Sequence, residues 1–382
     1  MGLSRMGFDG GLDDDERRWT LLRLLGWDTR KAQRLAFTFM IGVGGSLLFM
    51  LLNLPLPIFL GALTATIVAA VLDAPILRPR WLGPPMRAVL GVAVGAAFTP
   101  ALIGQMGGMA GSLLVLVPFT LLITIGGMAF FRHVAGYDRA TAFFAAVPGG
   151  LTDMVTMSAD AGADQRRVTL IHATRIALIV FTVPFFIQVA NGTSIGSQLP
   201  SLVHFWEMRA IDGLMLLVLA AGGHLIAQRL GLAGAPLVGP MLASGLLHAI
   251  GLTSAKVPFE LLALAQVSLA ILLGAQFRGL TLGEFGSTMI WGLLFTVFLL
   301  VSTAATSLAV AALTGFDTVS ILLAFAPGGQ AELSLLALIL GLDVAFIALH
   351  HLVRLAIIII GAQAVFLKNS DWQQHAQSRR RP

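Results

Sequence analysis

The chain has 382 residues, of which 57% are hydrophobic and only 11% charged, and its mean hydropathy is +0.88. Soluble globular domains carry about 25% charged residues, so this composition excludes an ordinary soluble fold and predicts a polytopic membrane protein. The net charge of +5 is concentrated in the tails, which is typical of segments beside anionic cytoplasmic lipid and not of a nucleic-acid surface. The absence of cysteine excludes disulfides and thiolate metal sites.

Ten apolar segments long enough to cross a bilayer form two sets of five. The first set lies near 35–53, 55–73, 86–104, 111–135 and 168–190, and the second near 210–229, 234–252, 258–277, 288–313 and 344–367. We expect five parts, namely an N-terminal tail with an interfacial helix or a solvated coil (1–33), a first membrane repeat (34–190), a polar linker (191–209), a second repeat (210–368) and a basic C-terminal tail (369–382).

The two sets match at a constant offset of 179 residues. Pro57 aligns with Pro236, and no gap is needed from there to the alignment of Arg175 with Arg354. The offset aligns Pro148-Gly149-Gly150 with Pro327-Gly328-Gly329, Asp153 with Glu332, His172 with His351, and Arg175 with Arg354. This register indicates an internal duplication, and repeats in a membrane chain favour a transporter.

A Pro-Gly-Gly segment lies between the fourth and fifth span of each set, at 138–163 and 317–342. If it crosses the membrane, the protein has 12 spans and parallel repeats; if it re-enters, the repeats are inverted. The positive-inside rule favours inversion, with nine loop arginines in the cytoplasm and two basic residues outside, against seven and four for parallel repeats. The predicted fold is therefore an all-α polytopic membrane protein of about ten transmembrane helices plus two broken or re-entrant helices, with both termini cytoplasmic. The nine arginines are Arg78, Arg80, Arg87, Arg132, Arg139, Arg166, Arg167, Arg229 and Arg278, and the two outside residues are Arg209 and Lys256.

The two breaks are candidate substrate sites. Proline and glycine stop a helix, and irregular backbone survives at membrane depth only inside protein or beside a water-filled cavity. New half-helices would begin at Leu151 and Gln330, and their free N–H groups and positive dipole ends suit an anion. The alternative is a kink that only shapes packing. The candidate substrate-binding residues here are Pro148, Gly149, Gly150, Thr152, Pro327, Gly328, Gly329 and Gln330.

Asp153 and Glu332 fall in the first turn after each break. They either stabilise the helix N-terminus or bind the proton or Na⁺ that drives transport. Thr152 could add a hydroxyl ligand in the first repeat, where the second repeat has Ala331.

Arg175 and Arg354 lie inside apolar spans, each three residues after a histidine, His172 or His351. The guanidinium of each arginine could bind a carboxylate or phosphate ligand through two parallel hydrogen bonds. Alternatively, it is a buried structural partner of an acidic side chain or of a carbonyl at a broken helix end. The histidines either relay protons or have a structural role. We interpret Asp164 and Asp343 as N-caps of these helices. We interpret Asp138 and Asp317 as caps or turn residues before the breaks.

Several catalytic motifs are absent, including a Walker A loop, a Ser-His-Asp order, an HExxH helix and a histidine cluster. We therefore expect no enzymatic activity, no catalytic residue, no cofactor, no resident metal and no nucleic-acid partner.

Two "PGG" segments, each followed by an acid and then by H-x-x-R in the next apolar helix, resemble the AbrB-duplication membrane protein family over roughly 35–367. Its members are labelled regulators of gene expression or ammonia monooxygenases. The resemblance implies a multi-pass protein of the bacterial inner membrane and transfers no catalytic residue.

Three functions are compatible with these patterns. The leading hypothesis is a secondary transporter of a small anionic organic solute, coupled to H⁺ or Na⁺. The second is a membrane sensor or regulator that signals through a partner, and the third is a membrane monooxygenase. The expected partners are the lipid bilayer, the solute and the coupling ion, with a homodimer as a further possibility.

Overall fold

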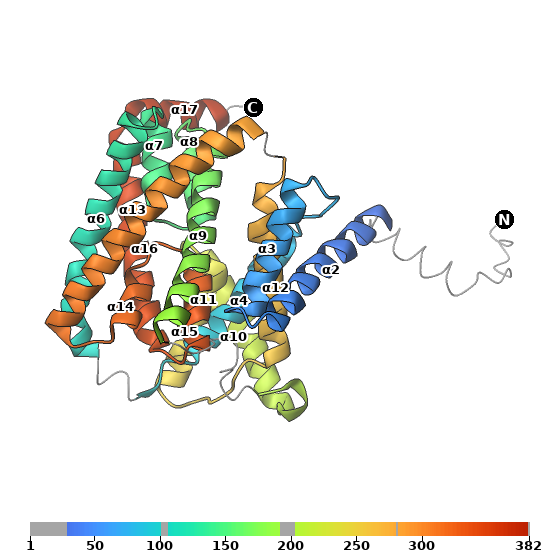
Figure 1. Ribbon diagram of the computed structural model, residues 1–382. Coiled ribbons are helices and arrows are strands. Elements are labelled where there is room, and N and C mark those ends of the chain that lie inside the picture. The colour runs from blue at the N-terminus through green and yellow to red at the C-terminus, as the bar shows by residue number, and fades with distance from the viewer. Residues whose placement is uncertain (1–28, 101–105, 192–202, 280–281, 381–382) are drawn as a thin grey trace, which may run out of the picture.

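The structure is a computed structural model that describes residues 29–100, 106–191, 203–279 and 282–380. All regular elements within these ranges are helices, and no strand occurs among them (Figure 1). Seven of the described helices are long and apolar enough to cross a membrane, which confirms the predicted class of fold. They are α2 (Thr29–Leu51), α6 (Ala110–His133), α9 (Gln165–Asn191), α10 (Ala210–Arg229), α12 (Phe259–Gly274, extended by the 3₁₀ turn η4, Ala275–Phe277), α13 (Leu282–Thr314) and α16 (Val344–Lys368).

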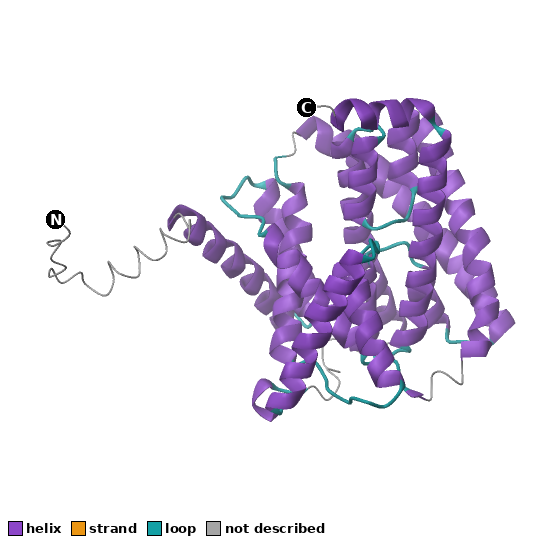
Figure 2. Ribbon diagram, turned by 180° about the vertical axis from the view of Figure 1, so that it is seen from behind, coloured by secondary structure: helices purple, strands orange, loops and turns teal. Residues whose placement is uncertain are grey.

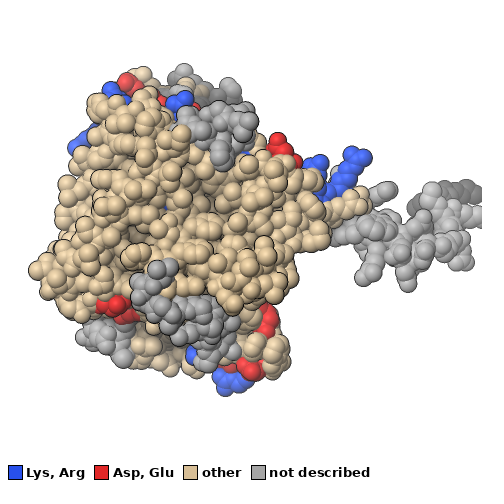
Figure 3. Space-filling model, viewed as in Figure 1, with Lys and Arg blue, Asp and Glu red and all other residues tan. Residues whose placement is uncertain are grey.

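The outer helices present apolar side chains to the surroundings. Leu51, Leu114 and Leu313 are 80%, 73% and 81% exposed. On the face shown in Figure 3, charged side chains gather at the upper and lower ends, and the band between them shows almost no charged side chains. Water would penalise such a band, whereas lipid does not, so the protein surface has the pattern of a membrane protein.

Three expected spans are shorter than a full crossing. These are α3 (Pro57–Val71), α4 (Gly83–Gly95) and α11 (Ala235–Ala249), with 15, 13 and 15 residues. A helix of 15 residues rises about 22 Å, less than the roughly 30 Å of the hydrocarbon core. α3 begins after Leu56 and α11 after Gly234, and both of these residues have left-handed backbone angles that the helix cannot continue through.

Glycines allow the short helices to pack closely. Gly45 of α2 lies against Gly61 of α3, and Gly223 of α10 lies against Gly239 of α11, with backbone approaching backbone in both pairs. A β-carbon at any of the four positions would overlap the partner helix.

The short helices also join the two halves of the chain. α4 packs against α11, and α12 packs against α3. Gly95 of α4 meets the backbone at Met241, and Gly274 of α12 meets Thr66. The two halves therefore meet in two close contacts, and each half contributes one helix to each contact.

Each Pro-Gly-Gly segment separates two short helices. The first lies between α7 (Arg139–Ala146) and α8 (Leu151–Asp160), the second between α14 (Thr318–Phe325) and α15 (Gln330–Ile339). The new helices begin at the two positions expected. In Figure 1, α7 and α8 lie towards the upper end of the bundle, and α14 and α15 towards the lower end. Seen from behind in Figure 2, loops cross the bundle at mid-height, where α7 and α14 end.

Each segment thus returns towards the end of the bundle that it came from, as the inverted alternative predicts. The bounds of α7 and α14, and of α8 and α15, differ by 179 residues, whereas those of α3 and α11 differ by 178. We interpret this correspondence between the helix bounds as the result of an internal duplication with inverted repeats.

Part of the expected C-terminal tail is a helix, α17 (Ser370–Arg380), which contacts α8 and α16. Its Trp372 is 7% exposed and packs on Phe143, Phe144 and Phe366. The expected N-terminal tail, apart from the start of α2 at Thr29, and most of the linker lie outside the described residues.

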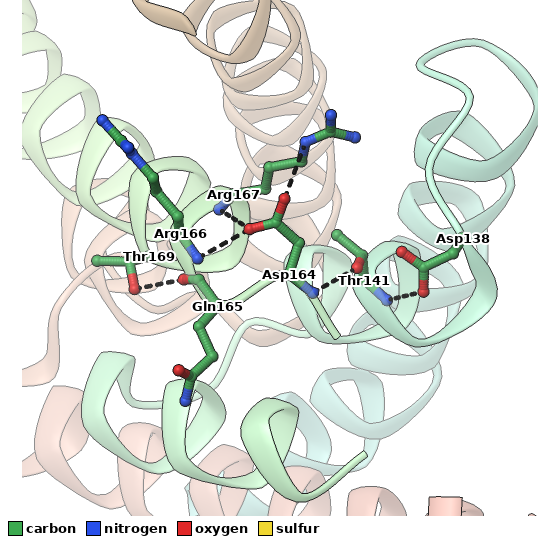
Figure 4. Close-up of polar contacts among 7 residues, drawn as sticks. All are labelled: Asp138, Thr141, Asp164, Gln165, Arg166, Arg167 and Thr169. Carbon is green, nitrogen blue, oxygen red and sulfur yellow. Dashed lines mark hydrogen bonds and ion pairs between the residues drawn. The ribbon is translucent and has the colours of Figure 1, made fainter. Parts of the chain in front are cut away.

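Four aspartates cap helices as predicted. Asp138 accepts a hydrogen bond from Thr141 N over 2.9 Å, and Asp164 accepts from Arg166 N and Arg167 N. Asp164 N in turn donates to the Thr141 hydroxyl, so the starts of α7 and α9 are tied together (Figure 4). The remaining pair repeats the pattern, with Asp317 accepting from Ser320 N and Asp343 from Phe346 N.

Candidate functional site

A central cavity of about 450 Å³ lies between the two breaks. Pro148, Gly149 and Gly150 form part of its wall, and Gly328, Gly329 and Gln330 form another part. Residues 179 positions apart in the sequence therefore meet at one site. The other polar residues of the wall are Arg87, Asp153, His224, Gln228, Glu332, His351 and Arg354.

Both half-helices point their N-termini into the central cavity. Gly150 and Gly329 are the N-cap residues of α8 and α15, and neither helix has a side-chain cap. The first N–H groups of a helix have no partner within the helix, and the dipole adds a partial positive charge there. Two such ends in one cavity suit a negatively charged ligand.

Two buried side-chain nitrogen atoms of wall residues have no hydrogen-bond partner within the described part of the chain. His351 is 1% exposed and its Nδ1 is unbonded, and the side-chain nitrogen of Gln330 is also unbonded. Buried polar atoms normally have a partner, so these two are groups that a bound solute or water would satisfy.

The two carboxylates lie at the helix ends themselves. Asp153 Oδ2 is 2.8 Å from the position that a β-carbon on Gly150 would take, and Glu332 Oε2 contacts the same position on Gly329. Both side chains are half-buried, and neither has an ion-pair partner among the described residues. Each carboxylate therefore lies where an external anion would bind.

Arg175 does not line the central cavity. It is fully buried, and its guanidinium donates to the carbonyls of Val147 and Gly149 over 3.3 and 3.5 Å. Its Nη2 lies 3.0 Å from His172 Nδ1, and His172 Nε2 lies 2.8 Å from the Phe144 carbonyl. The His172–Arg175 pair thus binds carbonyls at the end of α7 and in the break after it, which is the structural role considered for these residues.

Arg354 combines that role with a place on the cavity wall. Its Nη1 donates to the carbonyls of Ala326 and Phe325 over 2.6 and 3.3 Å, and His351 Nε2 lies 3.0 Å from the Leu323 carbonyl. Both residues also line the central cavity. The equivalent residues of the two halves therefore have different surroundings.

The other predicted positions are distributed as follows. Pro327 is buried beside the break without lining the cavity, and the side chain of Thr152 lies outside the described residues.

Sequence reasoning missed Arg87, His224 and Gln228. Arg87 had been counted as a cytoplasmic loop residue, but it lies within α4, one turn after Pro84, whose place at a helix start was a usable signal. The signal for His224 was a histidine inside an apolar helix.

The family model described as "Transition state regulatory protein AbrB" matches residues 58–368. The chain belongs to the AbrB family. The match runs from α3 to the end of α16 and contains every residue that lines the central cavity.

Two relatives have similar sequences at low identity. A protein of Escherichia coli strain K12 named "Putative regulator AbrB" is 24% identical over 318 residues, covering 83% of this chain and 91% of its own. "Uncharacterized protein YhjN" of Bacillus subtilis strain 168 is 25% identical over 260 residues, covering 64% of this chain and 67% of its own.

Proposed function

We propose that this AbrB-family protein is a secondary active transporter of a small anionic organic solute, coupled to H⁺ or Na⁺. The observation that carries the proposal is that the N-termini of α8 and α15 meet in one cavity beside Arg354 and Arg87. Discontinuous helices that point their N-termini at an anionic substrate near the midplane are a recurring feature of secondary transporters.

The central cavity suits a small carboxylate or phosphate ester. Its volume of about 450 Å³ is within the usual range for small-molecule sites. The free N–H groups of the half-helices would hold the acidic group, and Arg354 would add a charge-assisted hydrogen bond. Gln330 and His351 would bind polar groups on the rest of the solute.

Asp153 and Glu332 provide the coupling. A carboxylate at each helix end repels an incoming anion as long as it is ionised. A proton or a Na⁺ on the carboxylate removes that repulsion, so the ion and the solute bind together. Movement of the two halves against each other would then carry both across a bacterial inner membrane with cytoplasmic termini.

The test begins with thermal unfolding of the purified full-length protein in the presence of small mono- and dicarboxylates, phosphate esters and amines, with and without Na⁺, at two pH values. A ligand of the native state raises the apparent Tm by mass action. We expect an anion to raise Tm in the native protein but not in Arg87→Gln. Arg132→Gln, at an exposed site away from the cavity, is the matched control and should keep the shift. The stabilising anion should then enter proteoliposomes under an ion gradient.

Stabilisation only by amines, or equal anion shifts in Arg87→Gln and the native protein, would overturn the anion site. Binding without uptake would favour the second function, a membrane sensor or regulator, which the name of the Escherichia coli relative supports. The monooxygenase alternative has less support, because no group of three His, Asp or Glu side chains suited to a metal occurs among the described residues.

A further inference from the structure

A second cavity, of about 750 Å³, lies at the other end of α4 and α15. Its apolar wall includes Ala93, Ala97 and Leu338, and its polar residues include Arg209 and Lys256. Arg209 is paired with Asp212 over 2.8 Å, whereas Lys256 has no ion-pair partner within the described ranges. The unpaired exposed ammonium makes this opening attractive to anions.

The two cavities share the same two helices. α4 lines the central cavity with Pro84 and Arg87, and the second cavity with Ala93 and, two residues past the end of the helix, Ala97. α15 contributes Gln330 to the central cavity and Leu338 to the second. α4 and α15 pack against each other between the cavities.

One face of α15 runs from one cavity to the other. Gln330, Ser334 and Leu338 are spaced by four residues, so their side chains lie in one row. Ser334 in the middle is 1% exposed, and its hydroxyl has no partner among the described residues. A buried hydroxyl without a partner is unusual in a sealed helix contact, but suits a surface that becomes wet when two helices part.

The equivalent helices of the other half are arranged differently. Among the described residues, α8 and α12 do not pack as α15 and α4 do. The α4–α15 contact therefore has no equally extensive counterpart between the equivalent helices of the other half.

We propose that the second cavity is an outer mouth of the solute pathway, and that the anion passes between it and the central cavity along the Gln330–Ser334–Leu338 face of α15 when α4 and α15 separate. This inference rests on the proposed transport function. Lys256 would concentrate anions at the mouth, and the Ser334 hydroxyl would bind the solute or its water during passage.

The chain contains no cysteine, so single cysteines can be introduced into the otherwise native full-length protein. Ser334→Cys, Leu338→Cys and Lys256→Cys would be treated with a charged, membrane-impermeant methanethiosulfonate in right-side-out and inside-out vesicles. Ser307→Cys is the matched control, because Ser307 is also a fully buried helical serine but lies on α13, not on the face of α15 between the two cavities.

We expect all three pathway cysteines to react from the same side of the membrane, with Ser334→Cys reacting at least tenfold faster than Ser307→Cys. Rapid reaction of Lys256→Cys and Leu338→Cys, with Ser334→Cys as slow as Ser307→Cys, would overturn the inference. Labelling needs no solute, so this failure would leave an anion-dependent rise in Tm intact and would be distinguishable from failure of the proposed function.

Discussion

Arg354 donates a hydrogen bond from Nη1 to the carbonyl oxygen of Ala326 over 2.6 Å, and so fixes the break after α14 from the neighbouring helix α16. Arg175 makes the corresponding contacts to Val147 and Gly149 after α7. The end of a helix leaves carbonyls without partners, and membrane interiors offer no water to satisfy them. The two arginines therefore explain how a Pro-Gly-Gly break can exist at membrane depth.

Replacing Arg175 with Gln should destabilise the protein without removing the anion site. Loss of the guanidinium removes a donor to the buried Gly149 carbonyl, at a cost of about 1–3 kcal/mol, whereas the Val147 carbonyl still accepts from Gly149 N. We expect a lower Tm in detergent but an unchanged anion-dependent rise in Tm, because Arg175 does not line the cavity. Arg354→Gln should both lower the Tm in detergent and abolish the anion-dependent rise in Tm. An anion shift abolished by Arg175→Gln and kept by Arg354→Gln would contradict this assignment.

Neutral isosteres of the carboxylates should bind anions more tightly. Asp153→Asn and Glu332→Gln keep the size of the side chain but remove a negative charge at a helix end, where one charge is worth about 0.3–1 kcal/mol or somewhat more if partly buried. We expect the anion to bind roughly fivefold more tightly and uptake into proteoliposomes to lose its dependence on the ion gradient. Weaker binding in both variants would show that the carboxylates contact a cationic group of the ligand instead.

A methyl group on either N-cap glycine should displace the adjacent carboxylate. Gly150 and Gly329 have backbone angles that alanine adopts freely, so Gly150→Ala and Gly329→Ala act through the contact with Asp153 and Glu332. We expect altered ion coupling with a change in Tm of only a few degrees. Gly44→Ala is the control, since a β-carbon there meets nothing within 4 Å. Equal transport by all three variants would argue against carboxylates at the helix ends.

Loss of a cap before the second break should weaken α14. Asp317→Ala removes the acceptor for Ser320 N and should lower the free energy of unfolding by about 1 kcal/mol. Asp317→Asn retains a side-chain oxygen in the same place and should be close to the native protein. Thermal melting of the two variants side by side measures the difference, and equal destabilisation would mean that the charge, not the hydrogen bond, matters.

The membrane class, the positions of the long helices, the starts of α8 and α15 and the four aspartate caps could all be predicted from the sequence. Each depends on local chemistry, namely the length of an apolar segment, the missing donor of proline, or a carboxylate within three residues of a free N–H. The equivalence of Pro148 with Pro327 was also visible, because it is a pattern in the sequence itself.

Other features depended on contacts between distant segments. Nothing in the sequence around these helices shows that left-handed residues precede α3 and α11, or that glycines of α3, α4 and α11 contact the backbone of neighbouring helices. Nor do the matching H-x-x-R motifs reveal that Arg354 reaches the central cavity while Arg175 is sealed behind its break. Equivalent positions in two repeats have the same local chemistry, but what surrounds each one depends on how the halves pack, and only the tertiary structure decides that.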